Sequence, residues 1–229
     1  QGRDKMKGFS LLQRSLFLLS SVSVYNAFIV PPSTRARGIH QMAALVDVID
    51  LKEEIDLLDR VVDLSVTSFF GSLGDDFGFN NGRAIAFQKL FEEQRKDLEH
   101  SLDTEKDICL AARQADDGRV VGFVRLKNNL ILDNLCVDRS MRRQGIGLHL
   151  MDALMRKLLE NLKNVGTKSI LVSLLVDSDN PNAELFYRAA GWKKKGVSST
   201  TRYRVSWWRG LISEPCMQTE FTREVEIKD

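Results

Sequence analysis

The feature that most constrains the fold of this chain is a glycine-containing turn between two apolar segments. Residues 137–149 read Val-Asp-Arg-Ser-Met-Arg-Arg-Gln-Gly-Ile-Gly-Leu-His. The apolar run Leu130 to Val137 leads into them, and the periodic apolar stretch Ile146 to Leu162 follows. This order predicts a strand, a turn and an amphipathic helix. Such a turn aims unpaired backbone N–H groups and the positive end of the helix at one point, which suits a pyrophosphate group.

The spacing within the turn separates it from other phosphate-binding motifs. Gly-Lys-Ser/Thr of a Walker loop is missing, and so is the first glycine of the Rossmann pattern Gly-x-Gly-x-x-Gly. A glycine turn that binds no ligand is also common at such junctions. The segment from Arg142 to Gly147 fits Arg/Gln-x-x-Gly-x-Gly/Ala at every fixed position. It resembles the acyl-CoA pyrophosphate loop of the GNAT N-acetyltransferase family.

A second block of residues resembles the same family and follows in the expected order. The family pattern is Asn-x-x-Ala-x-x-x-Tyr-x-x-x-Gly-Phe. Asn180, Ala183, Tyr187 and Gly191 match it, and Trp192 replaces the phenylalanine. Two motifs in this order, with a predicted helix and strand between them, identify the family more specifically than either motif alone.

Apolar periodicity along the chain predicts the element order β-α-α-β-β-β-α-β-α-β-β. The glycine-rich segment Gly71 to Gly82 is expected to be a loop, and Asp116-Asp117-Gly118 a hairpin turn. The first helix carries Ile55, Leu58, Val62 and Val66 at helical spacing. Strands are expected at 43–49, 108–114, 119–127, 130–137, 169–176, 192–197 and 217–225, with 201–208 as strand or loop, and helices at 52–70, 85–102, 146–162 and 183–190.

The resemblance covers roughly residues 43–226 and implies the GNAT fold, which belongs to the α/β (α+β) class. This fold has a mixed, mostly antiparallel central sheet of six to seven strands with about four helices. Its fourth and fifth strands splay apart, and the co-substrate acetyl-CoA lies in the gap.

Carried over residue by residue, the resemblance implies an acetyl-CoA site. Main-chain groups of Leu135, Cys136 and Val137 would bond the pantetheine arm, and an N–H of the same strand would hold the oxyanion. Asn180 would contact the arm or cap the following helix. Tyr187 would lie near the sulfur and donate a proton to the leaving thiolate. The pyrophosphate would be held by Arg142, Arg143, Gln144, Gly145, Ile146 and Gly147, although either arginine can equally be a solvated side chain.

The resemblance to the family does not supply a general base in this chain. Bacterial relatives that acetylate protein N-termini have a glutamate five residues before the motif asparagine, and this position is Leu175 here. The nearby carboxylates Asp133, Asp177 and Glu184 do not match it. A water-mediated base, or no dedicated base, is compatible with an acceptor amine of low pKa. An α-amine, with a pKa near 7.7–8.0, needs less help than a lysine near 10.4.

These residues predict an N-acetyltransferase that moves an acetyl group from acetyl-CoA to a protein α-amine or lysine ε-amine. A small amine such as a polyamine is the alternative acceptor, and a non-catalytic acyl-CoA-binding regulatory module is the alternative class. Three dispersed cysteines and three dispersed histidines predict reduced thiols and no metal site. A net charge of +2 gives no argument for nucleic acid. The sequence does not specify an oligomeric state.

The N-terminal segment differs from the rest and is expected to be a targeting presequence. No acidic residue lies between Asp4 and Asp47, and a serine-interrupted apolar stretch precedes Pro31. This stretch is too short for a stable transmembrane helix. Ala27-Phe28 resembles the junction of two-part plastid presequences in algae such as diatoms. We therefore expect residues 1–42 to be a removed plastid presequence and 43–229 the catalytic domain, with mitochondrial, cytoplasmic or secretory locations as alternatives.

Overall fold

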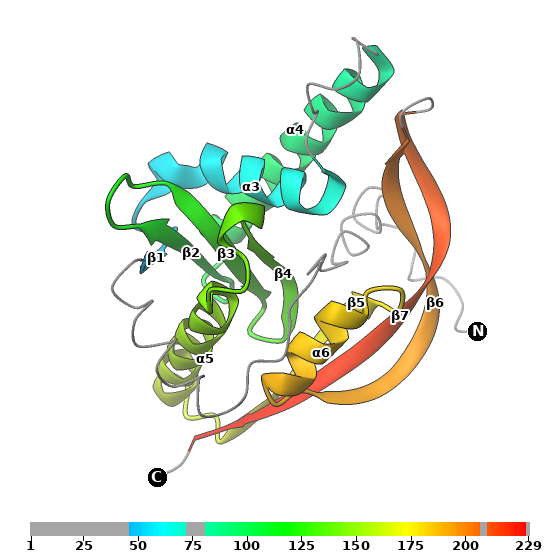
Figure 1. The fold of residues 1–229 in the computed structure, drawn as a ribbon. Helices are drawn as coiled ribbons and strands as arrows, with labels where there is room; N and C mark the ends of the chain where they lie inside the picture. The colour runs from blue at the N-terminus through cyan, green and yellow to red at the C-terminus, as the bar shows by residue number, and fades with distance from the viewer. Residues whose placement is uncertain (1–45, 72–80, 207–209, 228–229) are drawn as a thin grey trace, which may run out of the picture.

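The helices and strands follow the predicted order around one seven-stranded sheet (Figure 1). The computed structural model describes residues 46–71, 81–206 and 210–227. In chain order the elements are β1 (Val46–Asp50), the 3-10 helix η1 (Ile55–Leu57), α3 (Leu58–Phe70), α4 (Asn81–Asp103), β2 (Ile108–Gln114), β3 (Val120–Lys127), β4 (Ile131–Val137), the 3-10 helix η2 (Arg139–Met141), α5 (Ile146–Asn164), β5 (Ser169–Asp177), α6 (Pro181–Ala189), β6 (Lys193–Ser206) and β7 (Gly210–Glu226). The presequence predicted for residues 1–42 lies outside the described residues.

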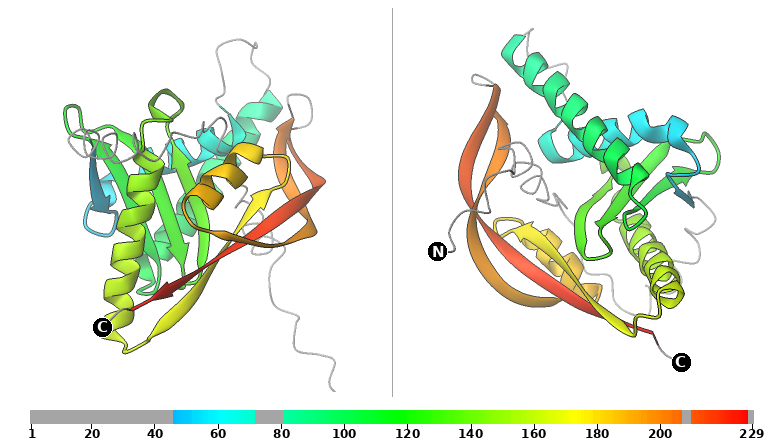
Figure 2. Two further views of the ribbon diagram at one scale, coloured as in Figure 1. Left: turned by 60° about the horizontal axis from the view of Figure 1, so that its bottom comes forward. Right: turned by 180° about the vertical axis from the view of Figure 1, so that it is seen from behind.

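An apolar core lies on each face of the sheet. Helices α5 and α6 cover one face, and α3 and α4 cover the other (Figures 1 and 2). Because alternate side chains of a strand point to opposite faces, β3 supplies both cores. Val124 packs into the core under α5 and α6, and its neighbour Phe123 packs into the core under α3 and α4.

The sheet order is β1-β2-β3-β4-β5-β7-β6, and among the described strands only the β4–β5 pair is parallel. β4 and β5 pair only through Ile131 with Ser173 and Leu132 with Leu174. Beyond these residues the two strands separate, whereas β5 stays paired with β7 along its whole length. The predicted splay between the fourth and fifth strands is confirmed.

A β-bulge in β4 lies where the two strands begin to separate. The adjacent β3 residues Arg125 and Leu126 pair with Asn134 and Leu132, which leaves Asp133 as the extra residue. A bulge bends its strand and increases the local twist. The bulge therefore contributes to turning the end of β4 away from β5.

The C-terminal hairpin is the main departure from the predicted elements. Strands were expected at 192–197 and 217–225, but β6 and β7 are longer and pair from Lys193–Thr222 to Ser206–Gly210, with one register shift between Lys194 and Gly196. The middle of β6 is rich in Ser, Thr and Arg, the middle of β7 is mostly polar, and both show little apolar alternation. The hydrogen-bonded pairing of β6 with β7 stabilises these segments as strands, and this pairing cannot be recognised from the local sequence. Residues 207–208 of the predicted 201–208 segment lie outside the described part of the chain.

Two predictions about the first helices are also corrected. Ile55 does not lie on the buried face, because it belongs to η1 and its surface is 62% exposed. Leu58, Val62 and Val66 form the buried face of α3 as expected. Helix α4 begins at Asn81, inside the predicted Gly71–Gly82 loop, of which residues 72–80 lie outside the described residues.

Candidate active site

The turn between β4 and α5 has the geometry of an anion-binding loop. Gly145 is the N-cap of α5 and has a φ of 88°, a left-handed conformation that favours glycine. A Cβ built on Gly145 would meet no atom within 4 Å among the described residues, so the space beside it is open. No side chain of the described residues caps this end of α5. The N–H groups of the first turn can therefore bind phosphate oxygens.

The polar side chains of this loop have different surroundings. Nε of Arg142 donates a hydrogen bond to the carbonyl oxygen of Val137 at 2.9 Å, and burial lowers the pKa of this guanidinium. Arg143 has a φ of 65° and an exposed side chain. Nε2 of Gln144 donates to the carbonyl oxygen of Ser140 at 3.4 Å. Arg142 thus holds the end of β4 against the loop, while Arg143 carries its charge at the surface.

Main-chain groups of β4 face the opening at alternate residues. The N–H of Asp138 donates to the carbonyl oxygen of Val121 on β3 at 2.8 Å. Because main-chain groups alternate in direction along a strand, Cys136 also directs its N–H and C=O to β3. Leu135 and Val137 direct theirs to the opposite side, where β5 has moved away. Two of the three predicted main-chain contacts therefore face the gap.

The two sequence motifs meet in space. The Ile146 side chain is buried and anchors the first turn of α5. A Cβ built on Gly147 would lie 3.5 Å from the ring of Phe186 on α6. The start of α5 is therefore in close proximity to α6, which carries the second motif.

Asn180 and Tyr187 are both fixed by α6. Oδ1 of Asn180 accepts a hydrogen bond from the N–H of Ala183 at 3.1 Å, so Asn180 is the N-cap that the sequence allowed. The Tyr187 ring is fully buried and lies edge-on to Trp192, with 5.9 Å between ring centroids. Burial raises the pKa of Tyr187 well above its usual range. Its hydroxyl is buried and has no hydrogen-bond partner within the described residues.

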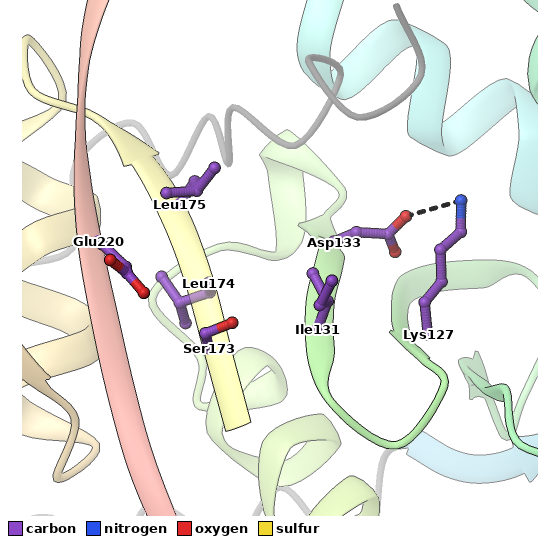
Figure 3. Close-up of a pocket in the computed structure, with 7 residues that line it drawn as sticks. All are labelled: Lys127, Ile131, Asp133, Ser173, Leu174, Leu175 and Glu220. Carbon is purple, nitrogen blue, oxygen red and sulfur yellow. Dashed lines mark ion pairs between the residues drawn. The ribbon is translucent and has the colours of Figure 1, made fainter. Parts of the chain in front are cut away.

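A cavity of about 270 Å³ opens where β4 and β5 begin to separate (Figure 3). Strands β4 and β5 form its two sides, and β7 runs along the side of β5 that faces away from β4. Its lining residues are Lys127, Ile131, Asp133, Ser173, Leu174, Leu175 and Glu220. One wall carries the bulge residue Asp133 and the other carries Leu175, so the cavity lies at the narrow end of the splay.

A buried network of charges supports the β4 wall. Arg125 is 3% exposed, and it donates to both carboxylate oxygens of Asp133 at 2.8 Å each. Arg125 also pairs with Asp97 of α4 at 2.6 Å, and Lys127 lies 3.0 Å from Asp97 and 3.1 Å from Asp133. Burial opposes ionisation of Asp97, but the two cations outweigh it and lower its pKa. Both carboxylate oxygens of Asp133 are therefore engaged by cations of this network.

The other carboxylates considered from the sequence lie outside the cavity lining. Oδ2 of Asp177 accepts from Arg202 at 2.9 Å. Oε1 of Glu184 accepts from Thr219 at 2.7 Å. The sequence patterns did not indicate Glu220 as a site residue. It reaches the cavity because the β5–β7 register places it opposite Leu175, and no local pattern specifies that register.

Neither a metal centre nor a membrane span appears in the described part of the chain. No group of three or more His, Cys, Asp or Glu side chains in these ranges is arranged to hold a metal ion. None of the described helices combines the length and apolar character needed to cross a bilayer.

Comparison with known proteins assigns the family. The profile of the acetyltransferase (GNAT) domain matches residues 81–206, which is more than half of the chain. The chain therefore belongs to the GNAT acetyltransferase family and is an acyltransferase by family. A comparison with curated protein sequences returned no match.

Solved structures share the fold at low sequence identity. The ribosomal-protein-S18-alanine N-acetyltransferase from Escherichia coli has a TM-score of 0.51 at 14% identity, covering 81% of this chain and 97% of its own. An aminoglycoside 6′-N-acetyltransferase complexed with coenzyme A has a TM-score of 0.51 at 15% identity, covering 80% and 99%. The PaiA N-acetyltransferase from Thermoplasma acidophilum, in complex with coenzyme A, gives 0.50 at 15%, covering 76% and 97%.

Proposed function

We propose that this protein transfers an acetyl group from acetyl-CoA to a primary amine of a protein or peptide, either an N-terminal α-amine or a lysine ε-amine. One observation carries the proposal. The gap between β4 and β5 has the open N-terminal end of α5 at its wide side and a cavity at its narrow side. A molecule with an anionic diphosphate, an extended amide-containing arm and a reactive end matches this sequence of environments.

The residues around the gap fit acetyl-CoA. N–H groups at the start of α5, beside Gly145, would hold the diphosphate. Main-chain groups of Leu135 and Val137 would bond the amides of the arm, except that the Val137 carbonyl already accepts from Arg142. The buried Tyr187 hydroxyl lacks a partner in the described residues, and Tyr187 does not line the cavity. For the sulfur end of the arm to supply this partner, the side chains that cover the hydroxyl would have to shift when the arm binds.

The chemistry expected of the chain is positioning and proton transfer. Acetyl-CoA supplies an activated acetyl group. The unpaired main-chain N–H groups of β4 would stabilise negative charge that develops on the carbonyl oxygen. Tyr187, whose raised pKa keeps it protonated, would donate a hydrogen bond and then a proton to the departing sulfur.

The cavity favours the reacting end of a longer substrate. Its volume of about 270 Å³ is small for a complete drug-sized ligand, for which pockets of about 300–1,000 Å³ are typical. An amine at the end of a flexible chain would enter without the rest of its molecule. The carboxylates of Asp133 and Glu220 also favour a cationic small amine, so a polyamine-like acceptor is the second candidate. Leu175, which cannot act as a base, is the feature that favours a non-catalytic acyl-CoA-binding module.

Proteins that share this fold differ in the substrates for which they are named. The Escherichia coli neighbour is named for an alanine of ribosomal protein S18 and another neighbour for aminoglycosides. The test is to incubate the full chain with acetyl-CoA and three amine sets: peptides with free N-termini and blocked lysines, peptides with the reverse protection, and spermidine. Mass spectrometry of the products supports the proposal if either peptide set is acetylated. Acetylation of spermidine alone supports the second candidate, and bound acetyl-CoA without product supports the non-catalytic module.

We also propose that residues 1–42 direct the protein to a plastid. The support is the acid-poor segment with its Ala27-Phe28 junction. A fluorescent fusion of residues 1–42 should enter plastids of an algal host, and accumulation in mitochondria, the cytoplasm or the medium would contradict this.

A further inference from the structure

Glu220 places a carboxylate beside the position at which the chain lacks a base. In the antiparallel β5–β7 pair, Leu175 lies directly opposite Glu220. Side chains at directly opposed positions share a face of the sheet, with about 4.5–5.5 Å between Cβ atoms. Both residues line the cavity, and Figure 3 shows the Glu220 carboxylate extending from β7 toward β5.

The other carboxylate of the cavity is already engaged. Both oxygens of Asp133 accept from Arg125, and Lys127 lies 3.1 Å from one of them. The Asp133 side chain is only 10% exposed. To act on an incoming amine, Asp133 would have to give up contacts with the buried Arg125 guanidinium.

Glu220 is held much more loosely. Oε1 accepts from Nζ of Lys195 at 3.0 Å, and the two side chains are 33% and 58% exposed. Exposed ion pairs of this kind contribute little and exchange readily with water. Within the described residues, Oε2 has no hydrogen bond, so one oxygen remains for an incoming amine. Glu220 shares the cavity lining with two other charged residues, Lys127 from β3 and Asp133 from β4, and it contacts Lys195 from β6.

We propose that Glu220 is the general base that deprotonates the acceptor amine. This inference rests on the proposed function, since it assigns the base of the same reaction. The ammonium form of the acceptor loses one proton to Glu220, directly or through one water, and keeps the electron pair on nitrogen. The carboxylate passes this proton to solvent. As the C–N bond forms and the C–S bond breaks, nitrogen loses a second proton, and the departing thiolate takes up one.

The first test compares two matched glutamine variants of the full chain. Glu220→Gln removes the base, and Glu224→Gln removes a carboxylate from the same strand opposite Leu171, outside the cavity lining. A general base contributes about 10²- to 10⁴-fold to rate. We expect kcat for a peptide acceptor at pH 7 to fall at least 100-fold in Glu220→Gln and less than twofold in Glu224→Gln. Acetyl-CoA binding, measured by calorimetry, should stay unchanged in both variants.

A pH comparison separates a base from a merely structural residue. The unprotonated fraction of an α-amine rises from about a tenth at pH 7 to nearly all at pH 9.5. The ratio of wild-type to Glu220→Gln rates should therefore fall about tenfold over this range. A structural role would leave that ratio constant, and a constant ratio would overturn the proposal.

A transplant of the carboxylate gives an independent test. In the double variant Leu175→Glu/Glu220→Gln, the carboxylate moves to the opposing strand on the same face. We expect at least tenfold recovery of kcat relative to Glu220→Gln. If Glu220→Gln kept the kcat of an active wild-type protein, Glu220 would not be the base, but the proposal that the protein transfers acetyl groups would stand. Loss in Glu220→Gln without recovery in the double variant would also count against it, and absence of turnover in the wild type would overturn both.

Discussion

Gly145 allows a test of the anion-binding loop in which backbone strain and ligand blockage can be separated. Gly145→Ala adds a Cβ at a φ of 88°, and Gly118→Ala adds one at a φ of 68° in the β2–β3 turn. In both places the new Cβ would meet no atom within 4 Å among the described residues. The two variants therefore carry similar backbone strain, but only Gly145 borders the proposed diphosphate site.

The expected magnitudes follow from this geometry. An L-residue in the left-handed region costs about 1–2 kcal/mol, which lowers the Tm of a chain of this size by about 2–8 °C. At Gly145 the Cβ would also enter the open space that is proposed to hold the diphosphate. Losing one hydrogen bond to a charged group costs about 1.5–3 kcal/mol, which corresponds to on the order of 10- to 100-fold in Kd.

The assay is calorimetric titration of acetyl-CoA into each variant, with thermal melting as the stability control. We expect similar losses of Tm in the two variants and weaker binding in Gly145→Ala alone. Equal acetyl-CoA affinity in both variants, with both folded, would refute the assignment of the loop.

Three further outcomes are expected. Tyr187→Phe should lower kcat about 100-fold without weakening acetyl-CoA binding. Its Tm should not fall, because the buried hydroxyl has no partner among the described residues. Unchanged turnover would remove Tyr187 from the mechanism. The pKa of Asp97 is lowered in the folded state, so its stabilisation is present above the unfolded value of 3.8 and is lost as pH falls through the folded value. Urea unfolding of Asp97→Asn at pH 7 should show a loss below the about 3–5 kcal/mol cost of an unpaired buried charge, because Arg125 keeps another partner. This loss should shrink as the pH falls below 3.8, and a loss that does not change with pH would contradict the prediction. Burial raises the pKa of Cys136 to about 12. Iodoacetamide at pH 8 should therefore modify the less buried Cys216 before Cys136, and mass spectrometry would give the order of modification. The reverse order would show that Cys136 is accessible.

Local signals in the sequence account for the parts of the fold that were predicted well. The bounds predicted for β2, 108–114, agree with the structure because a short apolar run ends at a clear Asp-Gly turn. Capping was one of the two roles predicted for Asn180, because its residue type and position before a helix favour that role. The glycine turn was located because Gly145 adopts a conformation that other residues rarely adopt.

Features that depend on pairing between distant segments were not predictable from one sequence. The middle of β6 and β7 lacks apolar alternation, so only their mutual pairing defines them as strands. Glu220 reaches the cavity through its register with Leu175, which no local pattern specifies. The pairing of Arg125 with Asp133 likewise follows from a bulge that appears only in the register of β3 and β4.

An experimental structure of the full chain with bound CoA would show whether the gap between β4 and β5 is the acetyl-CoA site. We expect the diphosphate to lie at the N–H groups that begin α5, beside Gly145. We also expect the arm to lie between β4 and β5, with the thiol directed to the cavity bounded by Asp133 and Glu220. CoA bound on another surface, with β4 and β5 separated but unoccupied, would contradict this expectation.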